Sequence, residues 1–218
     1  DGSTILVTGA TGLIGSQIIK ALACRNRICN ASIKILACVR NMEKAKVVFA
    51  DILDRAEFKI IEGDVTKIFD IKENVDYLIH TASATASKEF VTKPVEVIQT
   101  AINGTQNFLE LAKNKNAKGA VYLSSMEAFG VVQASDKKAE EKDLGFIDLE
   151  NVRSCYPESK RLSECLCTAY ASEYNVPIKV ARLSQTFGAG IHYSENRVFA
   201  QFAKSALEKR DIILHTTG

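Results

Sequence analysis

Short apolar runs and longer stretches with helical periodicity alternate along the chain. Nearly continuous hydrophobic runs predict six β-strands, at 3–9, 32–40, 57–64, 75–82, 118–125 and 177–184. Amphipathic spacing predicts helices at 14–25, 94–114 and 156–174. Strands that are apolar on both faces are typical of a parallel sheet covered by helices on either side. The pattern therefore predicts an α/β fold built on such a sheet.

Composition and charge limit the kind of protein this is. With 46% hydrophobic and 25% charged residues, the 218-residue chain is typical of a soluble globular protein. A net charge of +2 gives no reason to expect nucleic acid or an anionic membrane as a partner. No apolar run approaches the ~18 residues of a membrane span. No secretion signal opens the chain.

The cysteines point to a reducing compartment. The spacing of the 6 cysteines matches neither a zinc site nor a redox pair. Reduced thiols are typical of a cytoplasmic protein, and we expect this location. No cluster of metal ligands is apparent in the sequence, so we expect no metal site.

A glycine-rich segment follows the first predicted strand. The sequence VTGATGLIG places Gly9, Gly12 and Gly15 between that strand and the first predicted helix. In such a turn the first glycine allows a sharp bend, the second lets a pyrophosphate approach, and the third lets helix and strand pack tightly. The free N–H groups at the start of the helix then face the phosphates. In this βαβ context the motif predicts dinucleotide binding and a Rossmann-type doubly wound sheet.

Two residues bear on which dinucleotide is bound. Arg40 ends the second predicted strand, where many such folds carry an acid that holds the adenosine ribose. An arginine there can pair with a 2′-phosphate, which favours NADP over NAD, or it can point to solvent. Asp64, after the third strand, can accept from the adenine amino group or cap the following turn. The sequence leaves both questions open.

Tyr156 and Lys160 lie four residues apart on a predicted helix and therefore share a face. A phenol with an ordinary pKa of about 10 is a poor base at pH 7. A nearby ammonium, together with a positive nicotinamide ring, favours the phenolate. Tyr156 can then take a proton from a substrate alcohol while hydride leaves the same carbon. A further hydroxyl is expected from Ser124 or Ser125, at the carboxyl end of a strand, where parallel sheets bind ligands.

Together these motifs resemble the extended short-chain dehydrogenases/reductases, the group of NAD(P)-dependent nucleotide-sugar epimerases and dehydratases. The resemblance covers almost the whole chain. It rests on TGATGLIG, GDV at 63–65, LIHTASA at 78–84, GT at 104–105, SSMEAFG at 124–130, YPESK at 156–160 and RLSQTFG at 182–188.

The resemblance implies roles for particular residues. The catalytic triad would be Ser125, Tyr156 and Lys160, with Ser125 preferred over Ser124 for its spacing from Gly130. Lys160 would also hold the nicotinamide ribose. With the residues named above, the expected cofactor-binding set is Gly9, Thr11, Gly12, Leu13, Ile14, Gly15, Arg40, Asp64, Val65, Thr81, Ala82, Ser83, Tyr156, Lys160 and Leu183.

Departures from the family pattern concern the substrate. Ala101 and Gln185 replace asparagines that are common in the family, and the second of these commonly contacts substrate phosphates. Glu127 stands where the dehydratases and decarboxylases carry a glutamate, which in the dehydratases removes the C5 proton. Met126 stands where an Asp-Glu pair would place its acid, and it cannot donate a proton. Glu127 is thus expected either to act at C5 or to make a structural hydrogen bond.

Three functions are consistent with this sequence. The first is a nucleotide-sugar epimerase or dehydratase that removes hydride transiently at sugar C4, with Tyr156 as base and no net redox. The second is a net NADPH-dependent carbonyl reductase of the same superfamily. The third is a non-catalytic dinucleotide-binding protein. Turnover without added oxidant separates the first from the second.

The resemblance also predicts the domain organisation and assembly. Residues 1–187 would form the NAD(P)-binding Rossmann domain with the catalytic triad. Residues 188–218 would begin a truncated substrate-binding domain, and the stretch 196–218 reads as a helix and then a strand. Because the family commonly pairs through two helices, we expect a homodimer through 94–114 and 156–174. A nucleotide sugar is the expected substrate.

Overall fold

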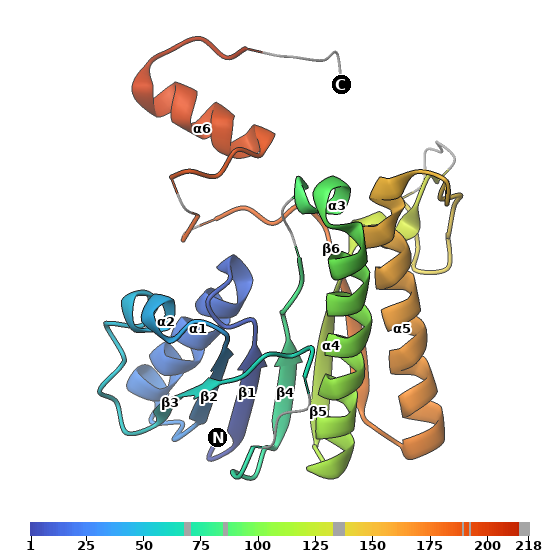
Figure 1. The fold of residues 1–218 in the computed structure, drawn as a ribbon. Coiled ribbons are helices and arrows are strands. Elements are labelled where there is room, and N and C mark those ends of the chain that lie inside the picture. The colour runs from blue at the N-terminus through green and yellow to red at the C-terminus, as the bar shows by residue number, and fades with distance from the viewer. Residues whose placement is uncertain (68–70, 85–86, 133–137, 189, 192, 214–218) are drawn as a thin grey trace. The chain divides into compact units, whose positions relative to one another are not determined.

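The computed structural model describes residues 1–67, 71–84, 87–132, 138–188, 190–191 and 193–213 (Figure 1). The chain divides into two compact units, Asp1–Ser184 and Gln185–Gly218. This division falls close to the boundary expected at 187/188, while the assignment of the second unit to a substrate domain stays a prediction. None of the helices in the described ranges is long and apolar enough to cross a membrane.

The first unit is built around one parallel sheet of 6 strands. The strands are β1 (Thr4–Thr8), β2 (Lys34–Val39), β3 (Phe58–Glu62), β4 (Tyr77–His80), β5 (Gly119–Ser125) and β6 (Ile178–Leu183). Their order in the sheet is β3-β2-β1-β4-β5-β6, and every pairing is parallel. Each strand lies within a run predicted from the sequence. The all-parallel strand order, which extends in both directions from β1, confirms the Rossmann-type doubly wound fold.

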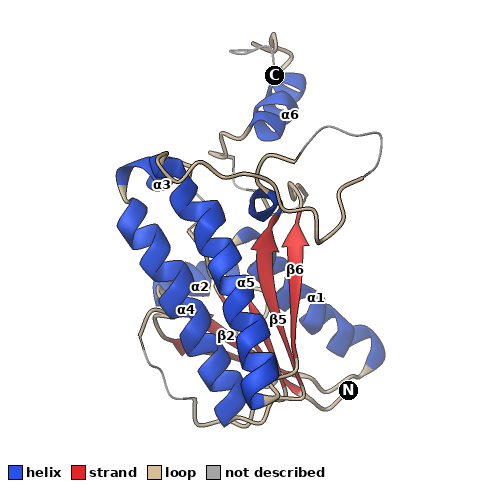
Figure 2. Cartoon of the chain, turned by 90° about the vertical axis from the view of Figure 1, so that its right-hand side faces the viewer, coloured by secondary structure: helices blue, strands red, loops and turns tan. Residues whose placement is uncertain are grey.

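Helices cover both faces of this sheet (Figures 1 and 2). On one face lie α1 (Leu13–Cys29) and α2 (Met42–Val48), which pack on Val7 and its neighbours. On the other face α4 (Pro94–Asn114) and α5 (Cys155–Tyr174) lie side by side and pack on Leu6. Successive residues of β1 thus enter opposite cores, as alternation along a strand requires.

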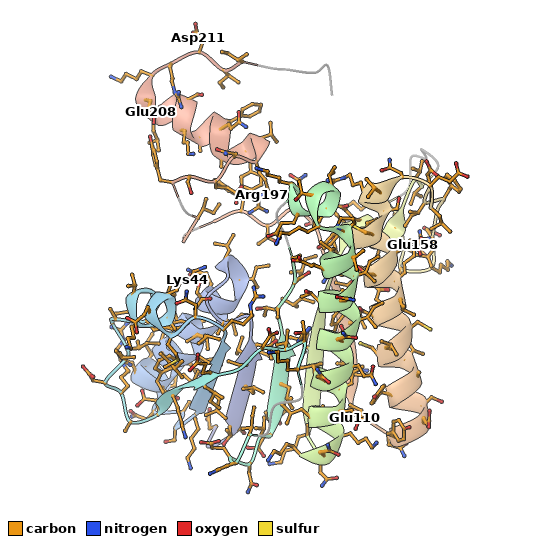
Figure 3. All side chains as sticks on the ribbon, in the orientation of Figure 1. Lys44, Glu110, Glu158, Arg197, Glu208 and Asp211 are labelled. Atoms are coloured by element: carbon orange, nitrogen blue, oxygen red, sulfur yellow. The ribbon has the colours of Figure 1, made fainter. Side chains whose placement is uncertain are left out.

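The pair α4 and α5 runs parallel, with both N-termini at the carboxyl edge of the sheet. Tyr170 of α5 donates a hydrogen bond of 2.7 Å to Glu110 near the far end of α4, while Glu158 lies in the first turn of α5 (Figure 3). Three short elements lie among the connections beyond the strands: α3 (Glu89–Thr92) and the 3₁₀ turns η1 (Met126–Phe129) and η2 (Val152–Ser154). The hydrophobic pattern did not predict these short elements.

The second unit contains α6 (Val198–Glu208). This helix was predicted from the sequence. The strand predicted after it is not seen in residues 210–213, which have no regular structure, and residues 214–218 lie outside the described part of the chain.

Candidate active site

The turn from β1 to α1 is packed against the segment that follows β4. Gly9 has a φ of +65°, and a Cβ there would lie 2.6 Å from the backbone N and Cα of Ala82. A Cβ at Gly15 would lie 2.5 Å from the Gly9 carbonyl oxygen and 2.8 Å from Thr81 Oγ1. Thr81 in turn donates a hydrogen bond of 2.7 Å to the Thr8 carbonyl. Gly9 and Gly15 are therefore required by close backbone packing.

Gly12 is less crowded than Gly9 and Gly15. A Cβ at Gly12 would meet only the Gly9 carbonyl oxygen, at 3.2 Å. Gly12 is the N-cap of α1, no side chain caps this end, and the first turn contains no acidic residue. The N–H groups of Leu13, Ile14 and Gly15 precede the first i→i−4 bond of the helix. Together with the positive end of the helix dipole, these groups fit a pyrophosphate.

Arg40 and Asp64 lie at the carboxyl ends of β2 and β3. Arg40 is exposed, directly after β2. Asp64 Oδ1 accepts hydrogen bonds from the N–H and the hydroxyl of Thr66, at 2.9 and 2.8 Å. Burial opposes ionisation of Asp64, but these bonds and the charges of Arg40 and Lys67 lower its pKa below the ordinary value. Asp64 thus caps the turn, one of the two roles expected for it, and adenine recognition stays a prediction.

The remaining predicted cofactor residues lie around these turns. Val65 is buried and packs against Gly104 of α4, while its carbonyl accepts a hydrogen bond of 2.8 Å from Asn107. Leu183 pairs with Ser125 in the ladder between β5 and β6. Thr11 lies in the turn before Gly12. Parallel topology therefore brings the carboxyl ends of these strands, and the residues that follow them, to one edge of the sheet.

Tyr156 and Lys160 lie in the first two turns of α5, facing β5. Their exposed fractions are 9% and 3%. Lys160 Nζ donates a hydrogen bond of 2.9 Å to the Leu123 carbonyl and lies 4.9 Å from the centre of the Tyr122 ring. It lies 5.7 Å from the centre of the Tyr156 ring. The amine and the phenol are thus brought together, as their helical spacing predicts.

The two serines at the end of β5 point in different directions. Ser124 donates a hydrogen bond of 2.5 Å to Oε1 of Glu164, which lies one helical turn beyond Lys160 on α5. The hydroxyls of Ser125 and of Ser83, from the segment after β4, lie near the Tyr156 hydroxyl and act to lower its pKa. Ser125 Oγ also accepts the N–H of Glu127 at 3.2 Å. Ser125, and not Ser124, therefore lies beside Tyr156, and its place in a catalytic triad stays a prediction.

The pKa of Tyr156 is shifted in the direction opposite to the one we expected. Burial raises it, hydrogen bonding to Ser125 lowers it, and the charge of Glu127 raises it further, for a net rise. Burial lowers the pKa of Lys160 to about 8, although the charge of Glu164 opposes this shift. Helical spacing indicates a neighbouring charge but not the desolvation of the phenol, and desolvation is the largest effect here. A positive nicotinamide ring would act in the opposite direction.

Glu127 makes an ion pair at the mouth of the site. Arg153 Nη2 lies 3.4 Å from Glu127 Oε1, and both side chains are partly exposed. The Arg153 guanidinium lies 5.2 Å from the centre of the Phe90 ring. Phe90 stacks on Tyr156 with the ring centres 4.4 Å apart. The structure thus contains a structural contact of Glu127, which was one of its two expected roles, and Arg153 also lies against the Phe90 ring that stacks on Tyr156.

Several site residues were not found in the sequence. Phe90 comes from the short helix α3, and Arg153 from η2, neither of which has a periodic signal. Glu164 had a signal, because it lies on α5 one further helical turn beyond Lys160, on the same face. Across the described ranges, no group of three His, Cys, Asp or Glu could hold a metal ion.

Comparison with known proteins identifies the family. Residues 5–218 match the NAD dependent epimerase/dehydratase family. The chain belongs to this family. UDP-glucuronic acid decarboxylase 1 of Xenopus tropicalis is 28% identical over 219 residues, covering 100% of this chain and 49% of that protein. UDP-glucuronic acid decarboxylase 6 of Arabidopsis thaliana is 29% identical over 98% of this chain and 60% of that protein.

Solved structures share the fold. UDP-glucuronic acid 4-epimerase from Bacillus cereus, in complex with UDP-glucuronic acid and NAD, superposes with a TM-score of 0.77 at 22% identity. The match covers 99% of this chain and 66% of that one. The chain spans about half the length of the first curated relative and somewhat more of the plant enzyme.

The glycine turn yields the first testable prediction. In Gly12→Ala the added methyl group meets only the Gly9 carbonyl oxygen, and the backbone of Gly12 (φ −75°, ψ 169°) suits alanine. We expect the protein to fold normally but to bind NAD(P) at least tenfold more weakly, about 1.4 kcal/mol. Calorimetric titration and thermal unfolding measure the two effects.

The matched control is Gly188→Ala, whose methyl group would meet nothing within 4 Å. It should change neither affinity nor stability. Unchanged dinucleotide affinity in Gly12→Ala would contradict the placement of the pyrophosphate at the start of α1.

Proposed function

We propose that the protein is a nucleotide-sugar epimerase or dehydratase that oxidises its sugar transiently at C4. The observation that carries this proposal is that Tyr156 lies near both Ser125 and Lys160, at the same sheet edge as the glycine turn. The NAD(P) of the family supplies hydride acceptance and return at the sugar carbon. Because the cofactor is restored, no added oxidant or reductant is consumed, unlike in a net carbonyl reductase.

The side chains of this site have distinct tasks. Ser125, which lies near the Tyr156 hydroxyl, orients the substrate hydroxyl between them. Tyr156 takes the proton from that hydroxyl as hydride leaves and returns it to the carbonyl oxygen in the reverse step. Lys160, fixed to the Leu123 carbonyl, supplies a positive charge beside the phenol and a donor for the nicotinamide ribose. Phe90 stacks on the phenol ring and restricts its orientation.

UDP-glucuronic acid is the substrate that we propose to test first. It is named in the curated relatives and in the solved epimerase structure. A uronate carboxylate would find a cation, Arg153, against the Phe90 ring that stacks on Tyr156. In an epimerase, the C4 ketone is reduced again from its opposite face. In a dehydratase or decarboxylase, the C4 ketone activates the neighbouring carbons, and elimination or decarboxylation follows. Glu127, beside Arg153, is the proposed group for a proton at C5.

Removing the phenol hydroxyl tests the proposed function. We expect the protein to convert UDP-glucuronic acid without added oxidant, and Tyr156→Phe to lower kcat about 10²- to 10⁴-fold because general acid–base catalysis is lost. Dinucleotide binding should persist in the variant. Product analysis by mass spectrometry and chromatography measures conversion.

Tyr174→Phe is the matched control, because Tyr174 lies on the same helix, is 41% exposed and is remote from the triad along α5. It should retain full activity. Comparable activity in Tyr156→Phe would remove Tyr156 from the mechanism, and dependence on a stoichiometric reductant would favour the net reductase.

We further propose that Arg40 makes the site tolerant of NADP. Arg40 is exposed and directly follows β2, where the adenosine ribose lies in many such folds. Arg40→Ala should therefore weaken NADP binding about tenfold while changing NAD affinity little, because only NADP offers the phosphate. Lys44→Ala, an exposed cation on α2 (Figure 3), is the control. Equal effects of Arg40→Ala on both dinucleotides would contradict this role.

A homodimer through α4 and α5 is also proposed. Both helices expose apolar side chains: Val95 and Ile98 of α4 are 63% and 37% exposed, and Leu162 of α5 is 46% exposed. Burying these residues against a second copy would remove them from water. We expect light scattering to give twice the chain mass, and Leu162→Glu to give a monomer. A monomeric mass for the unaltered protein would contradict the proposal.

A further inference from the structure

The face of α5 that carries Tyr156 and Lys160 continues to Glu164. These three residues are spaced at i, i+4 and i+8, so they form one column along the helix. The Glu164 side chain is 14% exposed. The mechanism proposed above uses the first two members of this column and leaves the third without a role.

The Glu164 carboxylate is held from two strands. Ser124 of β5 donates to Oε1 at 2.5 Å. Arg182 of β6 donates from Nε to Oε1 and Oε2, at 2.9 and 3.1 Å, and from Nη2 to Oε2 at 2.7 Å. Ser124 and Arg182 are direct partners in the ladder between β5 and β6. A bidentate arginine and a strand hydroxyl thus fix the carboxylate in one position.

Arg182 is itself held in place. Its Nη1 donates to the Glu141 carbonyl at 2.6 Å, and its guanidinium lies 4.7 Å from the centre of the Phe129 ring. Its side chain is 15% exposed. The ion pair is therefore partly buried, where screening by solvent is weaker than on the surface.

Several titratable groups face Lys160. From β4 comes His80, buried, with its pKa lowered to about 3 by burial and by the charge of Lys160, so it is neutral. From β5 comes Tyr122, whose pKa burial raises. From α5 come Tyr156 and Cys167, both with pKa values raised by burial, and Glu164. At neutral pH, Glu164 is the member of this set that carries a negative charge.

We propose that Glu164, fixed by Arg182 and Ser124, is a positioning residue that keeps the buried Lys160 charged for its work beside Tyr156. The catalytic meaning of this inference rests on the function proposed above. The charge of Glu164 opposes the effect of burial on the pKa of Lys160, which is about 8 as a result of both. Without that charge, the ammonium would be present in a smaller fraction of molecules at physiological pH.

Glu164→Gln removes the charge and keeps the shape of the side chain. We expect the pKa of Lys160 to fall by about one unit, a tenfold change in its deprotonation constant. Nitrogen-15 NMR titration of the lysine Nζ measures this directly on the protein without substrate, with Lys160→Met identifying the resonance. Glu173→Gln, at an exposed position on the same helix, should leave the titration unchanged.

Because Glu164→Gln leaves the Arg182 charge without its partner, a second variant guards against loss of folding. Glu164→Gln/Arg182→Gln removes both charges and retains hydrogen-bonding groups. The pKa of Lys160 should fall in this variant too, but by less. The positive charge of Arg182, which disfavours the ammonium, is lost together with the negative charge of Glu164. An unchanged Lys160 pKa in both variants would overturn the inference and leave the ion pair a structural clamp.

A pH profile separates this inference from the proposed function. In Glu164→Gln the loss of kcat at alkaline pH should begin about one unit lower than in the unaltered protein, following Lys160. A profile that does not move while the NMR pKa does would contradict a part for Lys160 in turnover. If the protein converts no nucleotide sugar, the proposed function is contradicted. If the pKa of Lys160 still falls in Glu164→Gln, the effect of Glu164 on Lys160 is supported all the same.

Discussion

The contact between the first turns of α5 and the carboxyl end of β5 creates the candidate active site. Lys160 crosses this contact to the Leu123 carbonyl at 2.9 Å, and Ser124 crosses it in the other direction to Glu164. Arg161 adds bonds of 2.8 Å to the Ala128 carbonyl and 2.7 Å to that of Gly145. Each bond satisfies a backbone or charged group that burial would otherwise leave unpaired at a cost of about 1–3 kcal/mol. The helix therefore has one register against the strand, and that register sets the phenol beside Ser125.

Parallel topology supplies the other half of the site. The backbone contact of Gly9 with Ala82 joins the turn after β1 to the segment after β4, which continues to Ser83 beside the phenol. A cofactor lying along this edge would extend from the region of Arg40, past the start of α1, to Lys160. The backbone of the glycine turn would thus hold the dinucleotide, whereas side chains from α5 and β5 would carry out the reaction.

The sequence predicted this framework well because its signals are local. Apolar runs located every strand, glycine spacing located the turn after β1, and helical spacing paired Tyr156 with Lys160. What it could not predict depends on tertiary packing. Phe90 reaches Tyr156 from a helix of 4 residues, too short for a periodic signal. The sign of the Tyr156 pKa shift depends on how deeply the phenol is buried, which no residue spacing records. The sequence could distinguish Ser125 from Ser124 only by its spacing from Gly130. The structure gives a physical reason, because Ser124 faces Glu164 while Ser125 faces Tyr156.

Burial of the catalytic pair has a chemical consequence. Both Tyr156 and Lys160 are shifted toward their neutral forms, so the protein alone does not prepare a phenolate. A positive ring bound next to them would change that balance, linking proton removal to the presence of the oxidised cofactor. Such coupling suits a reaction in which the hydride is taken and then given back.

The central claim is that hydride leaves sugar C4 and returns to the same sugar. The most direct measurement uses UDP-glucuronic acid deuterated at C4, incubated with the protein in unlabelled water without added oxidant. The account predicts a product sugar that retains the deuterium, which mass spectrometry detects. A product without deuterium, or deuterium accumulating in free reduced nucleotide, would contradict it.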